Sequence, residues 1–129
     1  MRKKFVAAAI LLAGCMTDSA ATPRQAADRW ALENARATGE PEDCIILNRI
    51  RSTHVRAGDV IDFEMSDGRI MRSRLPHACP GLAFEERFTY RTSLSRLCAV
   101  DTITVLDSSG TRGASCGLGP FQPVEIPRR

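Results

Sequence analysis

The sequence predicts a mainly β protein: a small antiparallel meander or barrel of five to six strands, with an N-terminal helix and disulfides as staples. Several short runs alternate apolar and polar residues, which is the period of a half-buried strand. Asp67-Gly68 separates two such runs, as in a β-hairpin. Four cysteines are spread through the same region, which is typical of small exported domains whose cores need covalent support.

The predicted organisation has four parts. They are a signal peptide (1–14), a lipidated cysteine with a tether (15–22), a helix (23–39) and a β domain (44–127).

The first part has the layout of a secretory signal peptide. Three basic residues precede a nine-residue apolar run, residues 5–13, which is too short to cross a bilayer core of about 30 Å as a helix. The run ends in Leu12-Ala13-Gly14-Cys15, which resembles the lipobox of bacterial lipoproteins, where the Cys thiol receives a diacylglycerol and the chain is cut before it. We expect lipid on Cys15 and a small polar tether behind it. The alternative is an ordinary signal peptide with a chance cysteine.

The net charge of +3 belongs to this signal peptide. The chain has 18 Lys+Arg and 15 Asp+Glu, and the segment before the cut contains Arg2, Lys3 and Lys4 but no acid. The mature chain therefore has 18 − 3 = 15 basic residues, all Arg, against 15 acidic ones. Because nucleic-acid binding needs a basic footprint, we expect no nucleic-acid partner.

Thr22-Pro23 has the pattern of a helix start, with Thr as the N-cap and Pro in the first turn. The following residues are rich in Ala, Leu, Arg, Glu and Gln, and Gly39 opposes continuation, so the helix is predicted over residues 23–39. Trp30, the only Trp, lies on its apolar face. We expect it to pack against the core or over one end of a sheet rather than to bind a ligand.

The Asp-Gly hairpin has two possible registers. A three-residue turn with Gly68 in the left-handed conformation pairs Phe63 with Met71. The same register places Asp62 opposite Arg72, whereas a two-residue turn pairs Phe63 with Arg72. We favour the three-residue turn, because it pairs apolar with apolar residues and opposite charges with each other.

The remaining strands are predicted from alternation alone. A bent first strand begins at Cys44, and further strands are expected over residues 87–92, 100–107 and 124–126. Prolines flank the last of these, which predicts a strand at a sheet edge.

Five cysteines are an odd number, and assigning Cys15 to lipid leaves Cys44, Cys79, Cys98 and Cys116. An even set in an exported domain indicates two disulfides, with one bridge and two thiols as the alternative. A zinc site would show two close Cys pairs, which gaps of 35, 19 and 18 residues do not provide. Four cysteines allow three connectivities, and the sequence does not decide among them. We lean to Cys44–Cys116, which ties the start of the domain to its end, and Cys79–Cys98, which closes a central loop.

No catalytic residue, metal ligand or cofactor motif is predicted. His54 and His77 are the only histidines, and no Ser-His-Asp order supports a nucleophile. Arginines on the predicted strands would form a basic patch for an anionic protein, lipid or glycan if they share a face. The candidate patch consists of Arg49, Arg51, Arg72 and Arg74. The alternative is that these arginines pair with acids on neighbouring strands, such as Asp62 and Glu64.

Several phrases of the β domain carry a family resemblance. They are Cys44-Ile45, Arg51-Ser52-Thr53, Asp67-Gly68, Leu75-Pro76-x-x-Cys79-Pro80-Gly81-Leu82, Phe88-x-Tyr90-Arg91-Thr92, Leu97-Cys98-x-x-Asp101-x-Ile103 and Cys116-Gly117-Leu118-Gly119-Pro120-Phe121. Together they resemble a family of small proteobacterial lipoproteins classed as a domain of unknown function. The match covers about residues 44–124 and includes all four cysteines of the β domain. The resemblance implies a periplasmic lipoprotein with disulfides and brings no catalytic residues.

The sequence thus predicts an exported protein, lipid-anchored to the cell envelope. Met16 follows Cys15 in place of the Asp that favours inner-membrane retention in Gram-negative lipoproteins, so the periplasmic face of the outer membrane is expected. The expected function is a non-catalytic binding or assembly module whose partners are the membrane and an envelope protein, glycan or lipid. The alternatives are a periplasmic enzyme or enzyme inhibitor acting through the loops around Cys79 and Cys116, and a purely structural lipoprotein.

Overall fold

The computed structural model describes residue 14 and residues 20–92 and 94–129. The predicted signal peptide up to residue 13, the lipidation site Cys15 and residues 16–19 of the tether lie outside the described residues. Within the described part of the chain, no helix has the length and apolarity needed to cross a membrane.

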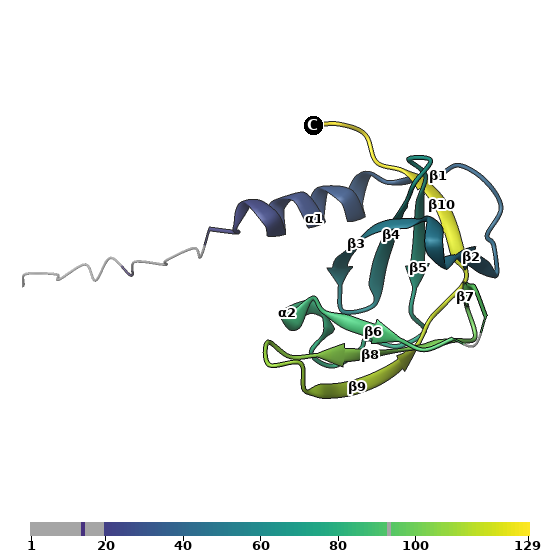
Figure 1. The fold of residues 1–129 in the computed structure, drawn as a ribbon. Coiled ribbons are helices and arrows are strands. Elements are labelled where there is room, and N and C mark those ends of the chain that lie inside the picture. Colours follow the sequence, from purple (N-terminus) through teal and green to yellow (C-terminus); the bar gives the residue numbers. More distant parts are fainter. Residues whose placement is uncertain (1–13, 15–19, 93) are drawn as a thin grey trace, which may run out of the picture.

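Ten strands form three antiparallel sheets in the described residues (Figure 1). The five-stranded sheet has the order β1-β10-β5-β4-β3, the three-stranded sheet has the order β6-β8-β9, and β2 pairs with β7. The strands are β1 (Arg36–Ala37), β2 (Cys44–Ile46), β3 (Ile50–Ala57), β4 (Val60–Met65), β5 (Ile70–Arg74), β6 (Phe88–Tyr90), β7 (Arg96–Cys98), β8 (Thr102–Leu106), β9 (Arg112–Gly117) and β10 (Phe121–Glu125).

Six of these strands have five or more residues, which confirms the mainly β, antiparallel prediction. The described strands form open sheets and no closed barrel. The helical elements are α1 (Pro23–Asn34), the one-turn 3₁₀ helix η1 (Leu47–Arg49) and the short α2 (Leu82–Glu85).

Helix α1 begins as predicted and ends early. The Thr22 hydroxyl accepts a hydrogen bond from the Gln25 backbone N–H at 3.2 Å, and the Gln25 side chain accepts one from the Thr22 N–H at 2.9 Å, which is a capping box. The predicted end at residue 39 is wrong, because β1 pairs with β10 directly after the helix. An extended backbone with sheet hydrogen bonds does not continue a helix.

Strands β4 and β5 pair in the register that the sequence favoured. Phe63 lies opposite Met71, and Asp62 lies opposite Arg72. Gly68 has a φ of 88°, the left-handed conformation that the three-residue turn requires and that glycine adopts without a Cβ penalty.

The core lies between the inner faces of the five-stranded and three-stranded sheets. Phe63 of β4 is fully buried and packs edge-on against Phe88 of β6, at 6.4 Å between ring centroids, and against Phe121 of β10, at 5.6 Å. Because side chains alternate along a strand, Asp62 and Arg72 point to the opposite face of the five-stranded sheet. Helix α1 lies on that side (Figure 1).

The prediction of two disulfides is confirmed, but the favoured pairing is wrong. The bridges are Cys44–Cys98 and Cys79–Cys116. Cys44 lies directly opposite Cys98 in the β2–β7 ladder, with Cα atoms 4.0 Å apart. Cys79, in the loop after β5, reaches Cys116 on β9 at a Cα distance of 5.9 Å. The pairing of β2 with β7 spans 54 residues of sequence and decides the connectivity.

The last predicted strand, β10, lies second from the sheet edge rather than at the edge. Pro123 has no N–H to donate, but its carbonyl accepts a hydrogen bond from the Thr38 N–H at 3.0 Å. Beyond β10, the half-buried Trp30 of α1 donates its indole N–H to the Pro127 carbonyl at 2.9 Å. Trp30 therefore ties the C-terminal tail to α1.

Candidate functional site

The four arginines of the predicted patch do not form one exposed surface. Arg49, Arg51 and Arg74 are exposed, but Arg72 is buried. The prediction is therefore wrong for Arg72, because α1 covers this part of the sheet. Arg51 lies 3.8 Å from a carboxylate oxygen of Glu64, as the alternative of cross-strand pairing predicted.

Arg72 belongs to a buried chain of charges that joins the sheet to α1. Its Nε donates to Asp62 Oδ1 at 2.7 Å and its Nη2 to Oδ2 at 2.9 Å, and Nη2 also donates to the Ala31 carbonyl of α1 at 3.1 Å. Arg56 donates from Nε to the same Asp62 carboxylate and from Nη1 to Asp28 of α1, each at 2.9 Å. We call these four charged residues the clamp: Asp28, Arg56, Asp62 and Arg72.

The clamp is balanced and structural. Burial lowers the pKa of Arg56, but hydrogen bonds to Asp28 and Asp62 outweigh it and leave the pKa above the ordinary value. Two arginines face two aspartates, so the formal charges of the clamp sum to zero. Ala31 is the only fully buried residue of α1, so apolar burial holds the helix weakly and the clamp supplies the rest.

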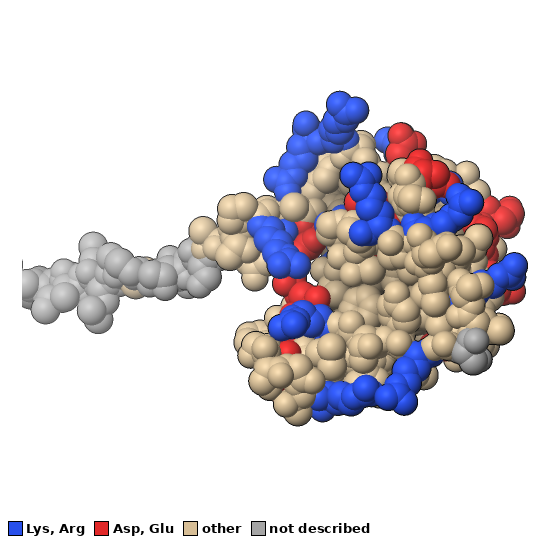
Figure 2. Space-filling model, viewed as in Figure 1, with Lys and Arg blue, Asp and Glu red and all other residues tan. Residues whose placement is uncertain are grey.

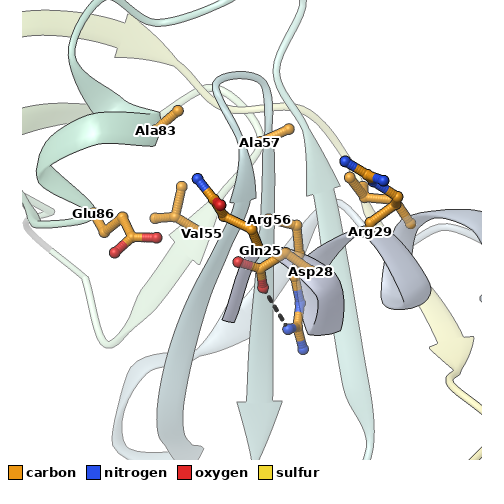
Figure 3. A pocket seen from close by; sticks show the side chains of 9 residues that line it. Gln25, Asp28, Arg29, Val55, Arg56, Ala57, Ala83 and Glu86 are labelled. Atoms are coloured by element: carbon orange, nitrogen blue, oxygen red, sulfur yellow. Dashed lines mark hydrogen bonds and ion pairs between the residues drawn. The ribbon is translucent and has the colours of Figure 1, made fainter. Parts of the chain in front are cut away.

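A cavity of about 300 Å³ lies between α1, β3 and α2, whose side chains approach one another there (Figure 3). Two acids line it. Asp28 is bonded to Arg56, and Glu86 lies 2.8 Å from Arg24 of α1. The volume is at the lower end of the range for ligand pockets, and these acids are already neutralised by arginines. Gln25 and the exposed Arg29 also line the cavity, so its remaining polar groups are an amide and a guanidinium rather than an acid or a base.

A second polar group lies on the exposed side of β3 and β4. The Ser52 hydroxyl lies 3.4 Å from His54 Nε2 and 3.1 Å from Glu64 Oε2, and those two atoms are 3.6 Å apart. In a Ser-His-acid triad the imidazole lies between the serine and the acid and uses both ring nitrogens. Here Nε2 faces both oxygens, so the geometry provides no relay for the serine proton.

The Cys79–Cys116 disulfide joins the loop after β5 to strand β9, so the enzyme or inhibitor alternative expected a loop around Cys116 where the structure has a strand. Residues 113–117 also have the Gly-x-Ser-x-Gly spacing of a nucleophile elbow. They lie within β9, however, and not at a strand-to-helix turn. The hydroxyl of Ser115 shares a hydrogen bond of 2.8 Å with that of Thr104, so its partner is another hydroxyl and not a base.

Metal-ligating side chains are dispersed. Within residues 20–92 and 94–129, no three side chains of His, Cys, Asp or Glu lie close enough to hold a metal ion. His77 is exposed in the turn after β5, and its neighbour Cys79 is bonded to Cys116.

The sequence-based prediction missed the outer face of the three-stranded sheet. Hydroxyl side chains form a row across its three strands, and arginines flank both ends of that row. We call this surface the Arg–hydroxyl face: Arg87, Thr89, Arg91, Thr104, Arg112 and Ser115. All three arginines are exposed, and none of them makes an ion pair in the described part of the chain.

The orientation of this face follows from strand alternation on β6 and from a register shift on β9, which places Arg112 opposite Leu106 although Ala114 and Cys116 pack against the core. Phe88 and Tyr90 of β6 pack against the core, so the residues between and beside them point outward. The pairing of β6 with β8 continues to Arg87, whose carbonyl accepts a hydrogen bond from the Leu106 N–H at 2.9 Å. The Arg-x-Thr-x-Arg spacing in the sequence signals one outward row, but the strands that complete the face lie far away in sequence.

Comparison with models of protein families, with curated proteins and with solved structures gives no match for this chain. The resemblance to a proteobacterial lipoprotein family therefore stays a prediction from the quoted motifs.

Proposed function

We propose that this protein is an exported lipoprotein, held in the cell envelope by lipid on Cys15, and that its β domain is a non-catalytic binding or assembly module. We further propose that it lies at the periplasmic face of the outer membrane. The basic segment, the apolar run and the lipobox-like Leu12-Ala13-Gly14-Cys15 support export and lipidation. The two disulfides support an oxidising compartment, because disulfides are rare in reducing ones.

The distribution of matched and unmatched charges carries the proposal of a binding module. The acids that line the cavity and the charges buried under α1 are matched, in the clamp and in the Arg24–Glu86 pair, whereas the exposed Arg29 beside the cavity makes no ion pair in the described residues. The arginines of the Arg–hydroxyl face are exposed and without ion pairs in the described residues. An active site needs poised acids or bases inside a cavity, whereas a binding surface needs accessible, unmatched groups. The Arg–hydroxyl face meets the condition for a binding surface.

Two glycines in the motifs that carry the family resemblance have structural roles in the fold. A Cβ at position 119 would collide with the backbone carbonyl of Arg74, so only glycine fits there. Gly81 has a φ of 81° at the start of α2, a conformation that favours glycine. Residues of this kind build a fold rather than a reaction centre.

The lipid anchor is tested by replacing Cys15 with Ser. We expect the native chain and a Met16→Ala control to incorporate labelled fatty acid and to sediment with membranes. The Cys15→Ser chain should lose the label and leave the membrane fraction. Unchanged labelling and sedimentation of Cys15→Ser would refute the anchor.

The binding role is tested by in-cell crosslinking from the mature domain. We expect crosslinks to a component of the envelope from positions on the Arg–hydroxyl face. Crosslinks confined to the segments around Cys79 and Cys116 would favour the enzyme or inhibitor alternative, since the disulfide brings these two segments together.

A further inference from the structure

We propose that the Arg–hydroxyl face lies against the anionic headgroups of the membrane to which the Cys15 lipid attaches the chain. The domain would then rest on the membrane with one defined side down. This inference depends on the lipid anchor of the proposed function and names the partner of the binding surface.

The face has a central row of hydroxyl groups and arginines on both sides of it. Arg87, Leu106 and Arg112 form one row across the three strands, on one side of the hydroxyl row. Arg91 lies on the other side of the hydroxyl row, in the continuation of β6. Neighbouring strands lie about 4.8 Å apart, and four residues along a strand span about 13 Å. The three guanidinium groups therefore stand on stems about 10 to 16 Å apart, which lets each reach a separate phosphate of a headgroup layer. Figure 2 shows basic side chains along this lower surface, over β9.

Two acids close to this face in the chain, Asp107 and Asp101, accept hydrogen bonds from backbone groups, and a third, Glu86, is paired with Arg24. Asp107, in the β8–β9 turn, accepts hydrogen bonds from the N–H groups of Ser109 and Thr111, each at 2.9 Å. Asp101, just before β8, accepts one from the Cys98 N–H at 2.7 Å. None of these acids pairs with an arginine of the face within the described residues, so the positive charge there is available to a partner.

The place where the tether enters the domain favours a membrane over a free polyanion. Arg24, in the first turn of α1, lies 2.8 Å from Glu86. Glu86 directly precedes Arg87, so the tethered end of the domain lies beside one end of the face. The eight residues 15–22 span at most about 29 Å when fully extended. A lipid on Cys15 therefore keeps the face within reach of the bilayer surface.

Three arginines give such a contact a useful strength. A basic residue near an anionic bilayer strengthens binding by about fivefold, so three of them favour the face-down orientation by a factor on the order of 100. The contact weakens as salt rises, because exposed charges are screened over about 8 Å at physiological ionic strength.

The test is a footprint of arginine reactivity on the processed, lipid-bearing chain. The protein is inserted into vesicles of phosphatidylcholine alone or of phosphatidylcholine with phosphatidylglycerol, and phenylglyoxal labelling of each arginine is followed by mass spectrometry. We expect labelling of Arg87, Arg91 and Arg112 to slow by at least about tenfold on the anionic vesicles and to recover at high salt. Labelling of Arg49 and Arg74, exposed on the five-stranded side, should be the same on both vesicles.

Two double variants give a matched control. R87Q/R112Q should restore the labelling of Arg91 on anionic vesicles, because two of the three arginines of the contact are removed. R49Q/R51Q should leave Arg91 protected. Equal labelling on both vesicles, or equal release of Arg91 by both variants, would overturn the proposal.

Two further outcomes separate this inference from its premises. Protection of Arg91 by dextran sulfate but not by anionic vesicles would overturn the membrane assignment and identify a polyanion as the partner. A chain that floats with neither kind of vesicle would refute the lipid anchor itself, whereas flotation without protection refutes only the docking face.

Discussion

Replacing Arg72 with Met is predicted to release α1 from the sheet and to destabilise the domain by about 3 kcal/mol. The Asp62 side chain is 1% exposed, and it would keep only its hydrogen bond to Arg56. Removing one partner of a buried ion pair costs about 3 to 5 kcal/mol, because the other charge stays buried. Since Arg56 remains in place, the lower value applies. The Ala31 carbonyl also loses the hydrogen bond that Arg72 donates.

The assay is urea unfolding with the disulfides intact, followed by two signals. Trp30 is the only Trp and lies on α1, so its fluorescence reports the docking of the helix. Far-ultraviolet circular dichroism reports the sheets. With a urea dependence of about 1.5 kcal/mol per molar, a loss of about 3 kcal/mol lowers the midpoint by about 2 M. In R72M the Trp30 transition should come first, because α1 buries little apolar surface of its own.

Two variants make this prediction refutable. R74M removes an exposed arginine of the same strand and should change the stability by no more than about 0.5 kcal/mol. D62L/R72M removes both partners and leaves the Asp28–Arg56 pair, so it should cost less than R72M alone. A loss below about 1 kcal/mol in R72M, or a double variant less stable than the single one, would show that the clamp does not hold the helix.

Three further predictions concern other parts of the domain. G119A should lower the free energy of unfolding in urea by at least about 2 kcal/mol, since the added Cβ collides with a backbone carbonyl; a neutral effect would contradict the close approach. The hydrogen bond from the Ser109 hydroxyl makes the largest contribution, and bonds from backbone N–H groups add to it, in lowering the pKa of Asp107 below its ordinary value of 3.8. The Asp107 carboxylate therefore stabilises the folded domain fully above pH 3.8, and this stabilisation is lost as the pH falls through the pKa of the folded state. The stability difference between the native chain and D107N should therefore shrink in acid, and a constant difference from neutral pH downward would refute this. Replacing Cys44 and Cys98 together by Ala should cost about 4 kcal/mol for a bridge that spans 54 residues, and peptide mapping that recovers Cys44 linked to Cys116 would contradict the structure.

Local signals were sufficient to predict the central hairpin down to its register. The Asp-Gly turn, the alternation and the charge pair all lie within about fifteen residues, so each constrains the others. Asp62 opposite Arg72 was predicted as a cross-strand pair and is found as one. Their burial was not predicted, because it depends on α1, which lies some thirty residues earlier in the chain and docks through Asp28 and the Ala31 carbonyl.

The disulfide pairing was predicted wrongly, and the Arg–hydroxyl face was not predicted, for the same reason. Cys44 meets Cys98 because β2 pairs with β7, and no residue near either cysteine specifies that ladder. Thr89 joins Thr104 and Ser115 in one row because β6 and β9 both pair with β8. Composition and alternation describe each strand, but the strand order is a property of the whole fold.

The arginines differ by what covers them: those under α1 are paired with aspartates, whereas uncovered ones, including Arg74 of the five-stranded sheet, are exposed. On the five-stranded sheet α1 lies over Arg56 and Arg72, and aspartates neutralise both. In the described residues no element covers the outer side of the three-stranded sheet, and Arg87, Arg91 and Arg112 stay exposed. Because α1 is also the element that leads to the tether, and its Arg24 pairs with Glu86 beside Arg87, the exposed arginines of the three-stranded sheet lie beside that tether, which suits contact with an anionic surface.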